Sequence, residues 1–454
     1  MRKQKLILMV APVATPLKSE LFAFPPLGLL YVAALTPSSY EIILYDENVE
    51  PQPLNVNDFA DQVDLVALTV MTSQAPRAYQ LADEFRKRGV PVVMGGIHPT
   101  ALPQEAKQHA SAVVIGEAEG IWEKFLIDWE SNSIQLFYRN ERFPSLEGLP
   151  FPRRDLLSRE SYIIPDTINV FRGCPHNCSF CSVTRFFGRT YRYRPLPEVI
   201  REIEKILVQS PVSPGRKFLG DLLCKRISHP IIGFMDDNIF GGKKTRDYTI
   251  KLLKALIPLK FYWGGQASVN IAKDEKLLEL AAKSGCKVLF IGLESINPES
   301  LKEARKGVNL RENYHKAVKT FHKHGIAVIG AFVFGFDSDD PHIFRETLEF
   351  SQAVKLDAMQ VSILTPLPGT ALWEKLEKEN RIITKDWKMY DFTYAVYKPK
   401  NFTPEELKNT REQAHRKAYS LKSILKRFPW IDYRRWVVYS VLNYGYRKQI
   451  FKRT

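Results

Sequence analysis

Short apolar runs alternate with amphipathic stretches along the first part of the chain. The apolar runs have the length and the β-branched content of buried strands, and they span residues 6–10, 41–44, 65–70, 90–94 and 112–115. Apolar residues at helical spacing lie between them, as in residues 75–88, which end in basic residues before Gly89. Strands that alternate with helices predict a parallel sheet covered by helices on both faces. We therefore expect a doubly wound α/β domain over residues 1–145.

A second series of the same kind begins near residue 167. Its candidate strands span residues 167–171, 231–235, 261–263, 288–291, 327–334 and 359–363, with helices between them such as 197–209, 245–257 and 274–283. Six strand–helix units predict a partial (β/α)6 barrel, which we assign to residues 160–375. Functional side chains in such folds gather at the carboxyl ends of the strands. Residues 376–454 remain as a C-terminal segment with helical character.

Composition limits the class of protein. A length of 454 residues allows two or three domains, and 45% apolar content is enough for large cores. The chain has five cysteines, of which three are clustered, and this argues for a reducing, cytoplasmic compartment rather than a secreted disulfide framework. The basic N-terminus and the apolar run 6–10 also fit a signal peptide, although a buried first strand explains that run equally well. No stretch reaches the roughly 18 uninterrupted apolar residues of a membrane-spanning helix.

The candidate chemistry concentrates in the run RGCPHNCSFC at residues 172–181, where Cys174, Cys178 and Cys181 have the spacing C-x3-C-x2-C. Three thiolates on one loop can hold three irons of a [4Fe–4S] cluster and leave the fourth iron open to a ligand. A structural zinc site is the alternative, but zinc usually takes four ligands from paired motifs. The other candidates do not complete a familiar zinc spacing; they are His176, Cys224 and Cys286, and we interpret the two cysteines as ordinary thiols.

This run resembles the radical S-adenosylmethionine (SAM) superfamily. Gly173 before the first cysteine and the aromatic Phe180 before the last also match that family. The resemblance implies that the amino and carboxylate groups of SAM chelate the open iron, and that SAM is cleaved to methionine and a 5′-deoxyadenosyl radical. It also implies an external electron donor such as flavodoxin or ferredoxin.

The first domain resembles the flavodoxin-like cobalamin-binding domain that precedes the barrel in one branch of the superfamily. The likeness rests on FPPLGLLY at residues 24–31, YDEN at 45–48 and VMGGIHP at 93–99. Gly95 and Gly96 end a strand there, so the backbone can approach a flat ligand; a tight β–α turn is the other interpretation. The family often ligates cobalt through D-x-H-x-x-G, but Asn48 and Pro51 replace its histidine and last glycine. We therefore expect cobalamin without a histidine ligand, and we expect His98 to cap a helix or face solvent.

The resemblance also assigns contacts with SAM to the strand ends. Asp236, Asp237 and Asn238 end the second barrel strand and would accept hydrogen bonds from the amino group or the ribose of SAM; an Asx turn is the other interpretation. Further contacts would come from Gln266, Glu294, Ser295, Gly335 and Pro368, together with Phe180. The resemblance covers about residues 1–375. The segment 210–230 is longer than the usual connection in the family, and we interpret it as a surface insertion.

The last 34 residues, 421–454, are rich in both cations and aromatic rings. They hold nine Lys or Arg, one acidic residue (Asp432) and eight aromatic residues, so they carry +8 of the net +15 of the chain. This mixture suits an anionic membrane surface. It also suits RNA, and a basic helix with an apolar side can simply pack on its own barrel.

Together these features imply a cobalamin-dependent radical SAM enzyme, cytoplasmic or peripheral on the inner face of the membrane. In methyl-transferring members of the family, the radical takes a hydrogen from an unactivated carbon and cobalamin supplies the methyl group. The tail favours a hydrophobic, lipid- or terpenoid-like small molecule as the substrate. Cyclisation or rearrangement without methyl transfer is the alternative. An RNA-modifying methylthiotransferase would carry a second cluster on N-terminal cysteines, but no cysteine precedes Cys174, and nucleic acid is therefore not the expected substrate.

Overall fold

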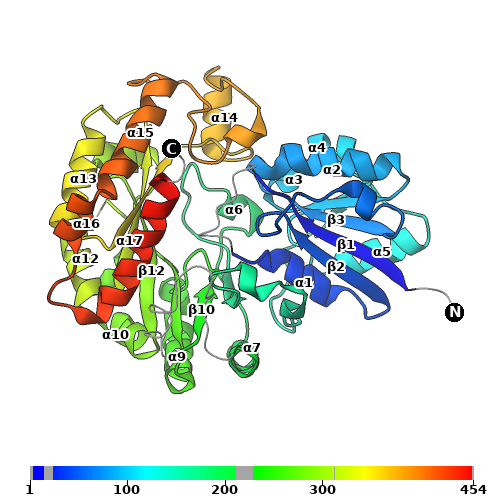
Figure 1. Cartoon of the computed structure of the whole chain (residues 1–454), viewed down its shortest axis with the longest axis horizontal. Helices are drawn as coiled ribbons and strands as arrows, with labels where there is room; N and C mark the ends of the chain where they lie inside the picture. The colour runs from blue at the N-terminus through cyan, green and yellow to red at the C-terminus, as the bar shows by residue number, and fades with distance from the viewer. Residues whose placement is uncertain (1–3, 15–23, 211–228, 311, 452–454) are drawn as a thin grey trace.

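The computed structural model describes residues 4–14, 24–210, 229–310 and 312–451. Two α/β bodies lie side by side, and the C-terminal helices pack against the second body (Figure 1). Most of the expected insertion at 210–230, including Cys224, lies outside the described residues.

The first body is built on a six-stranded parallel sheet in the order β2-β1-β3-β4-β5-β6. Its strands are β1 (Lys5–Ala11), β2 (Tyr40–Asp46), β3 (Leu65–Thr69), β4 (Val92–Gly95), β5 (Ala112–Ile115) and β6 (Phe137–Arg139). Helices α2 (Ala75–Lys87) and α4 (Pro103–His109) cover one face, and α1 (Leu27–Leu35) and α5 (Trp122–Glu130) cover the other (Figure 1). This confirms the doubly wound, flavodoxin-like domain. The apolar run at 6–10 forms the buried strand β1, while β6 has only three residues and gave no pattern to detect.

The second body is a six-stranded parallel sheet in the order β14-β13-β12-β11-β10-β7, as expected for a partial (β/α)6 barrel. Its strands are β7 (Thr167–Ile168), β10 (Ile231–Phe234), β11 (Tyr262–Ala267), β12 (Cys286–Glu294), β13 (Ala327–Phe334) and β14 (Ala358–Ile363). The helices are α7 (Leu196–Gln209), α9 (Arg246–Leu256), α10 (Glu275–Lys283), α11 (Pro298–Glu303), α12 (Tyr314–Lys323), α13 (Ile343–Ala353) and α14 (Ala371–Lys378).

The first barrel strand is shorter than its sequence suggests. It ends at Ile168 because the Oδ1 atom of Asp236 accepts hydrogen bonds from the backbone amides of Val170, at 2.9 Å, and Phe171. Amides that bond to a side chain cannot continue the ladder with β10. The chain instead forms the two-residue strand β8 (Phe171–Arg172), which pairs antiparallel with β9 (Arg192–Tyr193) and directs the chain into the cysteine loop.

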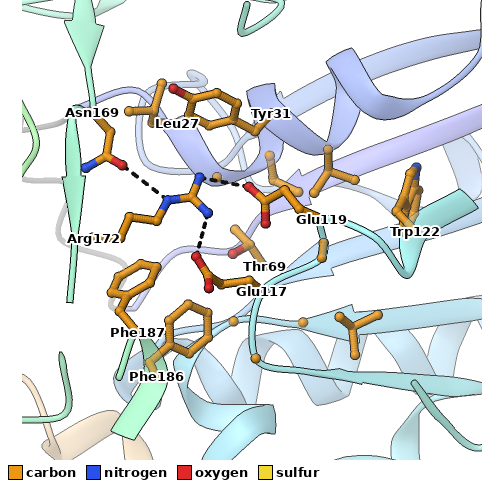
Figure 2. Close-up of a pocket in the computed structure, with 18 of the residues that line it drawn as sticks. Leu27, Tyr31, Thr69, Glu117, Glu119, Trp122, Asn169, Arg172, Phe186 and Phe187 are labelled. Atoms are coloured by element: carbon orange, nitrogen blue, oxygen red, sulfur yellow. Dashed lines mark hydrogen bonds and ion pairs between the residues drawn. The ribbon is translucent and has the colours of Figure 1, made fainter. Parts of the chain in front are cut away.

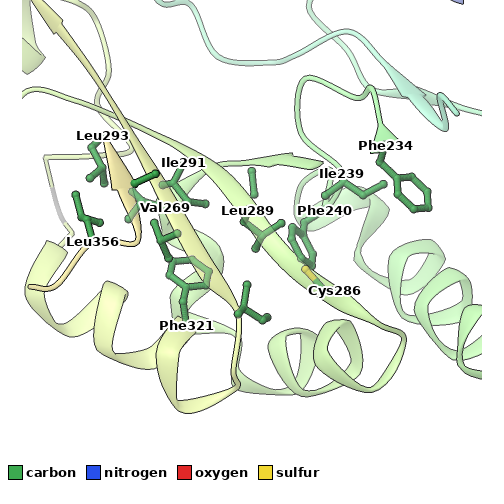
Figure 3. Packing of buried hydrophobic residues seen from close by; sticks show 14 of the residues in the cluster. Phe234, Ile239, Phe240, Val269, Cys286, Leu289, Ile291, Leu293, Phe321 and Leu356 are labelled. Carbon is green, nitrogen blue, oxygen red and sulfur yellow. The ribbon is translucent and has the colours of Figure 1, made fainter. Parts of the chain in front are cut away.

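A large apolar cluster fills the barrel. Figure 3 shows part of it, where Phe240 and Leu289 pack beside the Cys286 thiol. Cys286 is 2% exposed, and its burial among apolar side chains agrees with the interpretation of an ordinary thiol.

The C-terminal segment joins both bodies. Trp387 and Tyr390 pack into the core of the first body together with Trp373 of α14. The helices α15 (Pro404–Ala418), α16 (Leu421–Arg427) and α17 (Trp436–Phe451) lie on the barrel (Figure 1). The described part of this segment, residues 376–451, therefore extends both cores instead of forming a separate body.

Buried cations hold the end of the tail on the barrel. Arg427 is 1% exposed and donates to the Leu356 carbonyl at 2.8 Å, and Arg435 forms an ion pair with Asp357 at 2.5 Å. Asn443 of α17 donates to the Asp357 carbonyl at 2.8 Å. Of the three interpretations of the tail, intramolecular packing is thus present in the structure. Across the described segments of the chain, no helix is both long enough and apolar enough to cross a bilayer.

Candidate active site

The cysteine loop follows β8 and is fixed at both ends. Gly173 has φ +87°, and a Cβ there would lie 2.2 Å from the Thr190 carbonyl oxygen, so only glycine fits this turn. The Cys174 amide donates to the Gly188 carbonyl at 3.2 Å. Further along the loop, the Ser179 amide donates to the Ala304 carbonyl at 3.0 Å. The loop is therefore held between the turn after α6 (Val183–Phe186) and the end of α11.

Cys174, Cys178 and Cys181 are free, partly exposed thiols on this loop. Burial raises the pKa of all three thiols, that of Cys181 to about 12, while the nearby Lys306 ammonium lowers them. Within the ranges that the structure describes, no three Cys, His, Asp or Glu side chains converge on a single ion. A cubane cluster instead distributes its thiolates over separate irons. Three thiolates on a loop with fixed ends fit the donor set of such a cluster.

Two of the expected strand-end residues lie close to this loop. Glu294 ends β12 with φ +64°, and its carboxylate accepts from the partly buried Lys306 ammonium at 2.9 Å. The Phe180 ring lies 6.4 Å from the ring of Phe336, which follows Gly335 at the end of β13. The cysteine loop and the ends of β12 and β13 therefore meet.

The other expected contacts are distributed along the same edge of the barrel. Gln266 has an exposed side chain on β11, whereas Ser295 is buried and its hydroxyl accepts from the Asn297 amide at 3.0 Å. Gly335 donates its amide to Asp339 at 2.9 Å, and Pro368 is buried in the loop after β14. Contacts of these residues with SAM stay predictions.

The segment Asp236-Asp237-Asn238 divides into three roles. Asp236 is fully buried and binds backbone amides, so it shapes the first strand, a role that the sequence did not predict. The Oδ1 atom of Asn238 accepts from the Phe240 amide at 3.4 Å, which agrees with the Asx-turn interpretation, and its Nδ2 atom donates to the Gly241 carbonyl and the Tyr191 hydroxyl, each at 2.9 Å. Asp237 alone lines the cavity described below, and burial raises the pKa of its carboxyl to about 6.

A cavity of about 250 Å³ lies between the two bodies. The first body lines it with the carboxyl ends of β3, β4 and β5 and with the start of α1; the barrel lines it with residues on both sides of the cysteine loop (Figure 2). The paired glycines Gly95 and Gly96 form part of its wall. A Cβ built on Gly28 or Gly116 would meet nothing within 4 Å, so both glycines leave room for a ligand. An apolar cavity with glycine walls at this edge of a doubly wound sheet fits a flat cofactor such as cobalamin.

One arginine crosses the gap between the bodies beside this cavity. Arg172, at the end of β8, forms ion pairs with Glu117 at 2.6 Å and with Glu119 at 2.8 Å (Figure 2). Both carboxylates follow β5 in the first body. Glu117 forms a second ion pair with Arg192 of β9 at 2.7 Å.

Asn48 and His98 do not line this cavity. Asn48 donates to Asp46 at 2.7 Å. The expectation for His98 is wrong, because the ring is fully buried and its Nε2 atom lies 3.0 Å from the Tyr79 hydroxyl and 3.3 Å from Glu105. It lies in α3 (Ile97–Ala101) and contacts one residue each of α2 and α4, which places it in the protein core.

Comparisons with known proteins agree with this geometry. Residues 20–126 match the B12 binding domain family. The chain is 32% identical to the bacteriochlorophyllide d C-12(1)-methyltransferase of Chlorobaculum tepidum, over 93% of this chain and 89% of the relative. The chain belongs to the cobalamin-dependent radical SAM enzymes. As a member of this family, it uses a [4Fe–4S] cluster, SAM and cobalamin as cofactors.

Two further matches place this cobalamin-dependent radical SAM enzyme among its relatives. It is 26% identical to the hopanoid C-2 methylase of Rhodopseudomonas palustris, over 82% of this chain and 68% of the relative. Its fold resembles the cobalamin-dependent SAM radical enzyme OxsB, solved with aqua-cobalamin and SAM, with a TM-score of 0.69 and 15% identity over 99% of this chain and 72% of that chain.

Most residues of the cavity wall were not predicted from the sequence. Arg172, Glu117, Phe186 and Phe187 line the cavity but were not among the expected cofactor contacts. Glu117 could have been found, because it follows β5 directly and so lies at the same sheet edge as Gly95 and Gly96. Phe186 and Phe187 carry no such signal, since their place in the wall depends on how the two bodies meet.

The structure sharpens the prediction about the cobalt ligand. We expect bound cob(II)alamin to show no electron spin resonance splitting from a histidine nitrogen, because Asn48 stands where the family histidine would be and His98 is buried elsewhere. Labelling all histidines with ¹⁵N should leave the spectrum unchanged, and His98→Ala should do the same. A splitting that responds to the label and is lost in His98→Ala would contradict this prediction.

Proposed function

We propose that this enzyme methylates an unactivated carbon of a hydrophobic small molecule with a polycyclic skeleton. The observation that carries the proposal is the likeness over most of its length to a methyltransferase named for bacteriochlorophyllide, supported by the likeness to a hopanoid methylase. Both relatives are named for large, apolar ring systems.

The cavity suits this chemistry. When bound, the cluster and SAM supply a hydrogen-abstracting radical and cobalamin supplies the methyl group. The chain's own residues fix the geometry: Arg172 and Phe187, which flank the cysteine loop, line the cavity together with Gly95, Gly96 and Gly116 of the first body. Its apolar wall, with Leu27 and Phe187, excludes water from the reacting carbon. The enzyme also needs an external reductant, for which flavodoxin or ferredoxin is the expected class.

Comparing extracts of cells with and without the gene tests this function. We expect a lipid or tetrapyrrole that is heavier by one methylene unit only in cells with the gene, because methylation replaces a hydrogen by a methyl group. A product that has lost hydrogens without gaining a carbon would favour cyclisation, the second candidate within the family. Normal product in cells whose only copy carries Cys178→Ala would contradict both candidates.

We also propose that the outer face of the tail binds an anionic membrane surface. The inner face packs on the barrel, but large apolar side chains remain exposed around the turn between α16 and α17: Trp430 is 63%, Ile431 95% and Tyr433 77% exposed. Leu421 and Leu425 on α16 are 63% and 58% exposed. Exposed apolar patches of this kind mark interaction surfaces.

The charge beside this patch supports a lipid partner. Lys422 and Lys426 of α16 are exposed beside Leu421 and Leu425. Aromatic and aliphatic side chains flanked by lysines match the boundary between acyl chains and anionic headgroups. A membrane location would also give access to a hydrophobic substrate.

The triple variant Trp430→Ser, Ile431→Ser, Tyr433→Ser is expected to weaken binding to phosphatidylglycerol vesicles by at least about tenfold, because burying each large apolar side chain contributes about 1.5–3 kcal/mol. High salt should weaken binding of the unmodified protein, since it screens the lysines. Sedimentation with vesicles measures both effects.

The matched control removes Ile127, Leu136 and Val208, which are 58%, 56% and 86% exposed at other places on the surface. Serine at those positions should leave vesicle binding unchanged. Equal loss in both triple variants, or no binding by the unmodified protein, would contradict the membrane proposal. Binding to tRNA with a steep salt dependence, and none to vesicles, would assign the tail to nucleic acid.

A further inference from the structure

The cysteine loop and the cobalamin cavity share their residues. Arg172 lies two residues before Cys174, and Phe186 and Phe187 lie five and six residues after Cys181. All three side chains line the cavity (Figure 2). The segment that carries the three cysteines is therefore flanked on both sides by residues of the cavity wall.

Of these three side chains, only Arg172 forms ion pairs with the first body. Its three guanidinium nitrogens have separate partners: Nη1 bonds Glu117 at 2.6 Å, Nη2 bonds Glu119 at 2.8 Å, and Nε donates to Asn169 at 3.2 Å. The guanidinium also lies 5.4 Å from the ring centre of Tyr31 and 5.8 Å from that of Phe187.

The contacts of Arg172 come from both bodies. Glu117 and Glu119 follow β5, and Tyr31 lies in α1, so the first body contributes three of them, whereas Asn169 and Phe187 belong to the barrel. The Arg172 side chain is 8% exposed. A planar, fully engaged guanidinium of this kind fixes direction as well as distance, which a lysine cannot do.

We propose that Arg172 is a positioning residue that couples cobalamin binding to cluster binding. When the three cysteines hold a cluster, the loop between its two fixed ends loses its remaining freedom, and the contacts of Arg172 with Glu117 and Glu119 persist for more of the time before cobalamin arrives. The cavity wall then loses less conformational freedom when cobalamin binds, so the two cofactors bind with positive cooperativity. By linkage, cobalamin stabilises the cluster by the same factor.

This inference depends on the family's cofactors and not on the proposed substrate, so its test needs no turnover. The affinity for hydroxocobalamin is measured by equilibrium ultrafiltration, once with the cluster reconstituted and once with its iron removed. For the unmodified chain we expect the cluster to raise the affinity by about fivefold or more, the usual lower range of coupling between sites.

In Arg172→Met the affinity for hydroxocobalamin should be the same with and without the cluster. Glu119→Gln should also lose most of the coupling, although the cysteine loop itself is unchanged, and it decides the test if Arg172→Met retains neither cofactor. Arg172→Lys should show an intermediate ratio, because one ammonium cannot hold both carboxylates in a fixed geometry.

Arg381→Met is the matched control, because Arg381 forms a bidentate ion pair with Asp337 at 2.5 Å and neither residue lines the cavity. In this variant the cluster should raise the affinity for cobalamin by the same factor as in the unmodified protein. Equal affinities with and without the cluster in the unmodified chain would overturn the proposal. The proposal would also be overturned if the cluster raised the cobalamin affinity of both Arg172→Met and Glu119→Gln as much as it raises that of the unmodified protein.

Discussion

Alanine at any one of Cys174, Cys178 and Cys181 is expected to lower the yield of 5′-deoxyadenosine by at least about a hundredfold, because the cubane has only three protein ligands and no described cysteine can replace one. The other thiol that the structure describes, Cys286, is buried in the barrel core at the start of β12. The reconstituted unmodified protein should carry about four irons per chain, and each variant should carry far fewer. Chromatography of the nucleoside product and iron analysis measure the two effects.

Cys286→Ala is the control for this series. Its thiol packs among apolar side chains (Figure 3) and burial raises its pKa, so it stays protonated and takes no part in cluster binding. We expect full iron content and full SAM cleavage, with at most a small loss of stability. Unchanged SAM cleavage in Cys181→Ala would refute the assignment of the cluster site.

Phenylalanine in place of Gly28 is expected to lower the affinity for cobalamin by at least about a hundredfold, which corresponds to about 2.7 kcal/mol. Gly28 lies in the first turn of α1 and lines the cavity. A Cβ there meets nothing within 4 Å, so the new ring would extend into the cavity without disturbing the helix. Equilibrium ultrafiltration with hydroxocobalamin measures the change.

Gly28→Ala separates the effect of the ring from the effect of losing glycine. Its methyl group has open space, and alanine stabilises a helix relative to glycine by about 1 kcal/mol. This variant should therefore bind cobalamin normally and unfold at a slightly higher temperature. If Gly28→Phe bound cobalamin as tightly as Gly28→Ala, the cavity would not be the cobalamin site.

The periodicity of the sequence was sufficient to predict both sheets. The runs at 112–115 and 327–334 match β5 and β13 residue for residue, because uninterrupted β-branched and apolar residues have few alternatives to a buried strand. The cysteine spacing was also sufficient to predict the [4Fe–4S] cofactor, since it is a local pattern on one loop.

Features that depend on distant partners could not be predicted in this way. The strand at 167–171 breaks because the carboxylate of Asp236 captures two of its amides. His98 is buried by Tyr79 and Glu105, which are polar residues that only the folded domain brings to it. The pairing of Arg172 with Glu117 joins residues 55 positions apart and needs the contact between the two bodies.

The tail shows a different limit of sequence reasoning. Its composition suits lipid, RNA and its own barrel, and the structure shows that its two faces differ. Arg427 and Arg435 serve the inner face, where they bind carbonyls and Asp357, whereas Ile431 and Tyr433 remain on the outer face. Charge counted along the sequence did not distinguish these two sets.

The most direct test of the central claim is a turnover assay with the purified, reconstituted enzyme and SAM that carries a deuterated methyl group. The assay is anaerobic, uses an extract of cells that lack the gene as the source of substrate, and is run with and without cobalamin. The account predicts a hydrophobic product that gains one trideuteromethyl group, together with 5′-deoxyadenosine, only when cobalamin is present. A product without the label, or a labelled product that forms equally well without cobalamin, would contradict it.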